Sequence, residues 1–273
     1  MQKLQKVVEE WNETARSAWY MSYRTDAVIQ GILQNPASAF HPTTWTVLNE
    51  AVPDWRGAKI CVPSSGDNRA VFAFAALGAE VVSCDISPVQ LELAEGIADK
   101  YRLPVRFVVQ DTMGLPDIPS GTFDLVYTSE GVHVWISDLP AMYRQVFRVL
   151  RPGGAYVNYE IHPFCRPFDY DDARPVQGRI VVQKPYEQTE PRGDGTKYAW
   201  RLQDILNAAA GAGLQLRRLE EMHDDPVTGH FWFYETERAV MAQEEIEVYY
   251  DWRRNPLAAL PQWFTFRAVK ANT

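Results

Sequence analysis

The sequence predicts an α/β protein built on an open, mostly parallel sheet, and two observations predict it. First, the stretch from Lys59 to Asp85 runs as an apolar segment, a tight turn, a helical segment and a second apolar segment, which is the order of a β-α-β unit. Second, two predicted strands end in an acid, at Asp85 and Asp111. Ligands of open α/β sheets bind at the carboxyl ends of the strands, so both acids are expected at a binding edge.

The turn after the first strand is suited to a close approach by a ligand. Ser64, Ser65 and Gly66 are small, and the helix that follows directs its unpaired backbone N–H groups toward any negative part of that ligand. Asp85 lies 19 residues after Gly66, a spacing typical of a carboxylate that accepts hydrogen bonds from ribose hydroxyl groups. A plain β-α connection has the same local pattern, so the turn alone leaves both interpretations open.

The β-α alternation continues beyond the first unit. Residues 105–111 and 122–129 are predicted as the third and fourth strands, with turn signals at Leu115-Pro116 and at Pro119-Ser120-Gly121. Residues 139–150 have the pattern of an amphipathic helix that Arg151-Pro152-Gly153-Gly154 stops, and residues 155–159 are predicted as a fifth strand.

In this order and spacing the chain resembles the class I S-adenosylmethionine-dependent methyltransferases, most closely over residues 57–163. The resemblance is carried by Asp85-Ile86-Ser87, by Phe123-Asp124-Leu125-Val126 and by Arg148-Val149-Leu150-Arg151-Pro152-Gly153-Gly154. It implies a Rossmann-like sheet of seven mostly parallel strands whose last strand is antiparallel. Helices are expected on both faces, with a helical lid at the N-terminus.

The resemblance also implies S-adenosyl-L-methionine as the cofactor and assigns residues to it. The loop 64–68 matches the turn that surrounds the methionine part of the cofactor. Asp85 matches the acid that accepts hydrogen bonds from the ribose hydroxyls, and Ile86 matches the residue that packs on the adenine. Asp111 matches the acid on the adenine amino group, with Thr112 and Met113 beside the ring, and Ser129 lies near the sulfonium. The implied cofactor residues are Pro63, Ser64, Ser65, Gly66, Asn68, Asp85, Ile86, Asp111, Thr112, Met113 and Ser129.

One part of the chain departs from the family pattern. Where the family has an acidic residue followed by three alternating glycines, this chain has Val62, Ser64, Gly66 and Asn68. The carboxylate that often helps to hold the amino group of the cofactor is therefore missing. Asp67 and the N-terminal segment are the two candidate replacements.

Composition and charge narrow the classes of partner. The 273 residues are 46% hydrophobic, which suits one medium-sized domain with additions. A net charge of -8 argues against nucleic-acid and anionic-membrane substrates, and a small-molecule acceptor is expected. The lack of an apolar run of membrane-spanning length and the polar first residues predict a cytoplasmic protein.

Cysteine and histidine usage predicts neither a disulfide framework nor a metal site. The cysteines are odd in number, and Cys61 and Cys84 fall in predicted buried strands. His223 with Asp224 and Asp225 is the one grouping that could be drawn as a metal cluster, and a solvated loop is the favoured interpretation.

The chain divides into a helical extension, residues 1–55, and a methyltransferase-like domain, residues 56–273, with insertions at about 164–199 and 222–262. In the extension, an apolar face from Val7 to Trp19 and a helix over residues 43–51 predict a lid over the ligand cleft. Two interpretations remain open for the aromatic residues of this extension. Their rings bury the helix against the sheet, or Tyr20, Tyr23 or Arg24 reaches the ligand. A short strand is expected at 178–183, a helix at 201–212 and an antiparallel pair of strands at 214–219 and 263–269.

The implied chemistry is methyl transfer to a small-molecule acceptor by in-line displacement, which needs a base only when the acceptor carries a proton. The candidate bases are Glu130, His133 and His162, because they follow the fourth and fifth strands, and a structural hydrogen bond is the alternative role of each. A catalytically silent methyltransferase-like binding protein remains an alternative, and a nicotinamide-dependent oxidoreductase is a further one. The acceptor, the methylated atom and the oligomeric state are left open.

Overall fold

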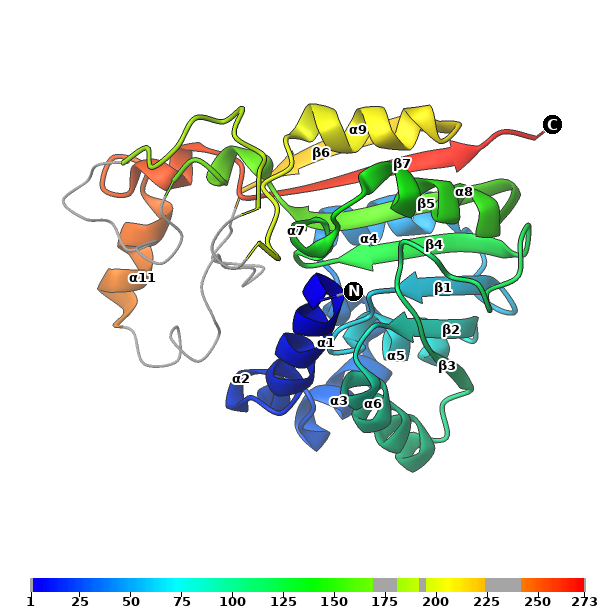
Figure 1. Cartoon of the computed structure of the whole chain (residues 1–273). Helices are drawn as coiled ribbons and strands as arrows, with labels where there is room; N and C mark the ends of the chain where they lie inside the picture. The colour runs from blue at the N-terminus through cyan, green and yellow to red at the C-terminus, as the bar shows by residue number, and fades with distance from the viewer. Residues whose placement is uncertain (1, 169–180, 192–194, 224–241, 273) are drawn as a thin grey trace.

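The computed structural model describes residues 2–168, 181–191, 195–223 and 242–272, and the described strands form one sheet (Figure 1). The order across the sheet is β3-β2-β1-β4-β5-β7-β6. Strands β1 to β5 are parallel, and β7 is antiparallel to both β5 and β6, so the predicted fold class is confirmed. The strands are β1 (Lys59–Pro63), β2 (Glu80–Asp85), β3 (Val105–Val109), β4 (Phe123–Ser129), β5 (Leu150–Ile161), β6 (Leu214–Met222) and β7 (Trp263–Lys270).

Helices connect the strands and precede the sheet. Before β1 lie α1 (Gln2–Ala15), α2 (Ala18–Ser22), α3 (Asp26–Gln34), η1 (Pro36–Ala39) and α4 (Pro42–Ala51). The connections within the sheet contain α5 (Arg69–Ala76), α6 (Pro88–Tyr101), α7 (Val132–Trp135), α8 (Leu139–Val149), η2 (Pro163–Cys165), α9 (Leu202–Gly211), α11 (Gln243–Tyr250) and η3 (Pro256–Ala259).

Alternating side chains divide the core into two layers, one on each face of the sheet. In β1, Ile60 and Val62 pack on the face that α4, α5 and α6 cover, whereas Cys61 packs on the face of α8 and α9. Phe72 of α5 is fully buried in the first layer, and Tyr143 of α8 is fully buried in the second. Because both faces are covered, the carboxyl edge of the sheet is where a ligand gains access.

Strand β5 begins five residues earlier than the sequence indicates. Residues 151–154 were expected to be a turn after the helix, but Leu150 already pairs with Phe123, and the register then shifts before Leu125 pairs with Ala155. A Cβ on Gly154 would lie 2.7 Å from the carbonyl oxygen of Phe123. The small residues therefore allow an irregular, close pairing at the start of the strand rather than a free turn.

The N-terminal extension is broken into more helices than its apolar pattern predicts. The face from Val7 to Trp19 spans α1 and α2, and Ser17 interrupts it by accepting a hydrogen bond from the backbone N–H of Tyr20, which caps α2. Helix α3 and η1 were not predicted. Helix α1 lies beside α6 at the carboxyl ends of β1 and β2 (Figure 1), where Ser87 Oγ donates to Asn12 Oδ1 over 2.7 Å.

The insertions are described only in part. Of the strand expected at 178–183, residues 178–180 lie outside the described residues, and Val182 forms an isolated bridge with Phe168. Asp224 and Asp225, next to His223, also lie outside them. Helix α11 and η3 were not predicted within the second insertion. In the part of the chain that the structure describes, no helix is both long and apolar enough to cross a membrane.

Candidate active site

A cavity of about 280 Å³ opens at the carboxyl edge of the sheet. Its floor is formed by the residues that follow β1, β2, β3 and β4, and its cover by α1, Tyr20 of α2, the segment 135–137 and residues 195, 196 and 198. The cavity therefore lies where the sequence places the ligand, between the strand ends and the N-terminal segment.

The cavity brings together most of the residues that the sequence assigns to the cofactor, together with one of the three candidate bases. Its lining includes Ser64, Ser65, Gly66, Asp85, Ile86, Asp111, Thr112, Met113, Ser129 and Glu130. Pro63 and Asn68 do not line it. The Asn68 side chain instead shapes the turn, since Nδ2 donates to the Gly66 carbonyl oxygen over 2.8 Å and Oδ1 accepts from Ser83 Oγ over 2.6 Å.

The turn after β1 has a left-handed backbone at alternate residues. Ser64, Gly66 and Asn68 have φ values of 53°, 55° and 66°, a conformation that is unfavourable for residues other than glycine. Ser64 Oγ lies 2.7 Å from Thr112 Oγ1, so a hydrogen bond joins this turn to the loop after β3. The surrounding structure thus holds a strained turn open toward the cavity.

Asp85 is a buried carboxylate at the end of β2, only 4% exposed. Its Oδ2 accepts from the backbone N–H of Gly66 over 3.0 Å, and its Oδ1 accepts from that of Ser87 over 2.9 Å. Burial raises the pKa of Asp85 to about 6, although these hydrogen bonds oppose the rise. Burial also raises the pKa of Asp111, whose Oδ1 accepts from the backbone N–H of Met113 over 2.9 Å.

Two of the candidate bases lie away from the cavity. His133 is buried, with Nε2 2.8 Å from the Tyr143 hydroxyl and Nδ1 3.0 Å from Glu160 Oε2. His162 is also buried, with Nε2 2.8 Å from Glu221 Oε1. Neither ring lines the cavity.

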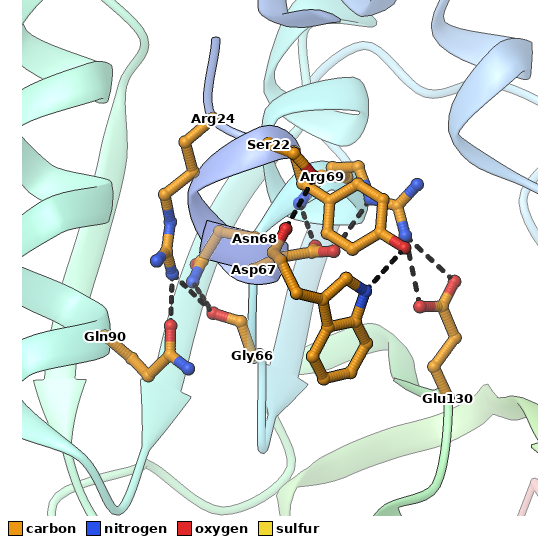
Figure 2. Close-up of polar contacts among 10 residues, drawn as sticks. Ser22, Arg24, Gly66, Asp67, Asn68, Arg69, Gln90 and Glu130 are labelled. Carbon is orange, nitrogen blue, oxygen red and sulfur yellow. Dashed lines mark hydrogen bonds and ion pairs between the residues drawn. The ribbon is translucent and has the colours of Figure 1, made fainter. Parts of the chain in front are cut away.

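Glu130 does line the cavity and belongs to a charged cluster at its edge (Figure 2). Its carboxylate lies 3.1 Å from Arg69 Nη2, while Arg69 Nε lies 2.7 Å from Asp67 Oδ2. The guanidinium of Arg69 also stacks over the ring of Tyr23, 4.1 Å from its centroid. Glu130 has a φ of 62°, so its backbone is strained next to the cavity.

The N-terminal segment contributes to the site mainly through rings. Tyr20 lines the cavity and Trp11 packs edge-on against Trp135, with centroids 5.2 Å apart. Arg24 does not line it. Its Nη2 donates to the Gly66 carbonyl oxygen over 3.4 Å (Figure 2). Its Nη1 donates to the Ala15 carbonyl oxygen over 2.8 Å, so Arg24 ties α1 to the turn.

Other lining residues were not predicted from the sequence. They include Lys3, Leu4, Gly195, Thr196 and Tyr198, together with Ile136 and Ser137. The segment 195–198 is distant in sequence from the strand ends, and it is held near α1 by the ion pair of Lys197 with Glu10 at 2.9 Å. The sequence bounded the first insertion at about 164–199 but did not indicate which of its residues line the cavity.

Comparisons with known proteins agree with the geometry. Residues 64–154 match the family model described as a methyltransferase domain. The chain is 31% identical over 158 residues to a sterol 24-C-methyltransferase of Aspergillus fumigatus, covering 57% of this chain and 39% of that protein. It is 36% identical over 99 residues to a demethylmenaquinone methyltransferase of Thermus thermophilus, covering 36% and 44%. The chain thus spans less than half the length of these relatives.

Solved structures share the fold at low sequence identity. An S-adenosylmethionine-dependent methyltransferase from Mesorhizobium loti superposes with a TM-score of 0.60 at 23% identity, over 82% of this chain and 96% of that one. The geranyl diphosphate C-methyltransferase of Streptomyces coelicolor gives 0.60 at 14% identity, over 99% of both chains. The chain is thus similar in sequence to a methyltransferase domain over residues 64–154, and similar in fold to solved methyltransferase structures.

Proposed function

We propose that this chain transfers the methyl group of S-adenosyl-L-methionine to a small-molecule acceptor. The observation that carries the proposal is the cavity in which the turn at Gly66 meets the strand-end acids Asp85 and Asp111. These groups match the chemistry of a nucleoside ligand, since buried carboxylates accept hydrogen bonds from ribose hydroxyls and from an adenine amino group.

The residues present fit the cofactor. Asp85 would hold the ribose hydroxyls and Asp111 the adenine amino group, with Ile86 and Met113 packing on the ring. The turn of Ser64, Ser65 and Gly66 would lie beside the methionine part. Gly66 suits this role because its left-handed backbone and its missing side chain leave room for a ligand.

When bound, the cofactor would supply a methyl group that its sulfonium charge already activates for in-line displacement. The chain has to align the acceptor and exclude water. Helix α1 and the segment 195–198 cover the cavity and so exclude water from it. For an acceptor that carries a proton, the carboxylate of Glu130 takes that proton, because Glu130 is the one candidate base that lines the cavity.

The nature of the lining supports a small-molecule acceptor. The cover of the cavity presents Leu4, Val7, Trp11, Trp135 and Tyr198, which suit an apolar or aromatic compound. The relatives and the neighbour named above act, by their names, on a sterol, demethylmenaquinone and geranyl diphosphate. The net charge of -8 supports a substrate other than nucleic acid. A cytoplasmic location is part of the proposal, supported by three buried cysteines that form no disulfide bond.

Calorimetric titration with S-adenosyl-L-methionine, with S-adenosyl-L-homocysteine and with NAD⁺ tests the cofactor. We expect binding of the first two and none of the third. Asp85→Asn should weaken binding by roughly 1.5 to 3 kcal/mol, the range for hydrogen bonds to a charged group. Asp99→Asn, on the exposed face of α6, is the matched control and should bind as the parent does.

The proposal is overturned if neither S-adenosyl-L-methionine nor S-adenosyl-L-homocysteine binds, or if NAD⁺ binds instead. Activity is then measured with cofactor carrying a labelled methyl group against a panel of apolar small molecules. Cofactor binding without transfer to any extract of small metabolites would favour the silent binding protein over an enzyme.

A further inference from the structure

The Tyr20 hydroxyl group lies at the cavity, beside the Gly66 turn. Tyr20 is 8% exposed and lines the cavity. Its Oη lies 3.4 Å from the position that a Cβ on Gly66 would take. No hydrogen bond joins this hydroxyl to any residue that the structure describes. Because the hydroxyl of a largely buried tyrosine normally has a hydrogen-bond partner, this one is positioned for a ligand in the cavity.

The electrostatic surroundings of the hydroxyl favour a cation. Asp67 and Glu130 line the same part of the cavity and share the single guanidinium of Arg69, so these three groups carry a net negative charge. Burial raises the pKa of Tyr20 well above its usual value, the negative charges of Asp67, Glu130 and Asp85 raise it further, and the positive charge of Arg24 opposes them. The three acids near the hydroxyl outnumber the guanidinium groups of Arg24 and Arg69, which favours an ammonium group over a carboxylate.

Asp67 retains the capacity to bind such a group. Its Oδ1 accepts from the backbone N–H of Arg69 over 2.9 Å, and its Oδ2 accepts from Arg69 Nε over 2.7 Å. Each carboxylate oxygen can accept two hydrogen bonds, so both oxygens can accept another. A primary ammonium group has three donors, which one carboxylate oxygen and a phenol oxygen satisfy in part.

We propose that Tyr20 and Asp67 bind the α-ammonium group of the methionine part of the cofactor. The inference rests on the proposed function. It names residues that replace a missing contact to the amino group of the cofactor, since Val62 stands where the family has an acid. Tyr20 belongs to the N-terminal segment and Asp67 to the turn after β1. The N-terminal segment is then part of the cofactor site as well as a cover over it.

The test compares two ligands that differ only in the ammonium group. S-adenosyl-L-homocysteine and its analogue with hydrogen in place of the α-amino group are titrated calorimetrically into the parent protein. We expect the parent to prefer the amino ligand by about tenfold or more. In Tyr20→Phe and in Asp67→Asn the preference should fall to within about threefold, with the loss confined to the amino ligand.

Tyr101→Phe is the matched control, because the Tyr101 hydroxyl donates to Asp26 at the surface and Tyr101 does not line the cavity. It should keep the preference of the parent. Asp67→Asn also loses an ion pair with Arg69, so a variant that fails to fold leaves Tyr20→Phe as the decisive measurement. The inference is overturned if the parent binds both ligands equally, or if Tyr20→Phe keeps the preference. Failure of the parent to bind either ligand would instead remove the proposed function.

Discussion

The backbone N–H of Gly66 donates to Oδ2 of Asp85 over 3.0 Å, so the turn after β1 and the acid at the end of β2 form one hydrogen-bonded unit. The same carboxylate lines the cavity, and burial raises its pKa to about 6. The group that would hold the ribose therefore changes charge close to neutrality, and its charge state is linked to the shape of the turn.

This linkage predicts a pH dependence of cofactor binding. Ribose hydroxyls donate to the ionised carboxylate, so binding favours the deprotonated form and weakens as the pH falls through about 6. The dissociation constant at pH 5 should be about tenfold larger than at pH 7, as measured by calorimetry. Asp85→Asn should bind more weakly at pH 7 and lose this dependence. An unchanged dependence in Asp85→Asn would assign it to another group.

Folding stability should respond to the same group with the opposite sign. The folded-state pKa of Asp85 is above that of the unfolded chain, so the folded state holds this proton more tightly. The contribution of Asp85 to the free energy of unfolding therefore becomes less favourable as the pH rises from about 4 to 6. Keeping an ionised carboxylate in the cavity therefore lowers the free energy of unfolding at neutral pH.

The start of β5 provides a prediction about stability. Gly154→Ala would place a Cβ 2.7 Å from the Phe123 carbonyl oxygen and 3.0 Å from that of Arg151, both backbone atoms. We expect a loss of about 2 kcal/mol or more in the free energy of unfolding, because overpacking forces the strands apart. Gly31→Ala in α3 meets nothing within 4 Å and should be neutral or stabilising. Equal unfolding midpoints in urea for both variants would contradict this account.

The sequence indicated which strand-end residues lie at the cavity, but not which residues from other segments cover it. Asp85 and Asp111 could be placed because the end of a parallel strand fixes the position of its last residue at one edge of the sheet. His133 comes only three residues after Glu130, but α7 turns its ring toward Tyr143 and Glu160, away from the cavity. A side-chain direction within one helical turn depends on tertiary packing, which spacing from a strand does not record.

Residues that come from distant segments were the hardest to predict. Tyr198 lies beside the cavity because its segment packs against α1, a relationship that neither stretch signals by itself. The break at Ser17 was missed for a different reason: the apolar spacing continues through it, and only the cap hydrogen bond to Tyr20 reveals the second helix.

The N-terminal segment should become more ordered when cofactor binds. Val7, Trp11 and Tyr20 line the cavity, and Arg24 connects Ala15 to the Gly66 turn. We expect backbone amide exchange across residues 7–30 to slow on addition of S-adenosyl-L-homocysteine, because local opening then has to release the ligand. Strand β7 serves as an internal reference that should not change. Unchanged exchange over residues 7–30 would make this segment a static support rather than a lid.

Glu130 provides the prediction about catalysis. If the acceptor has to lose a proton, Glu130→Gln should lower the rate of methyl transfer by about 10² to 10⁴, because glutamine cannot take that proton. Cofactor affinity should stay within a few fold of the parent, measured by calorimetry on the same preparation. Glu92→Gln, on the exposed face of α6, controls for loss of a carboxylate elsewhere. Full activity of Glu130→Gln on an identified acceptor would remove the base from the mechanism and leave alignment, by the rings that cover the cavity, as the contribution of the protein.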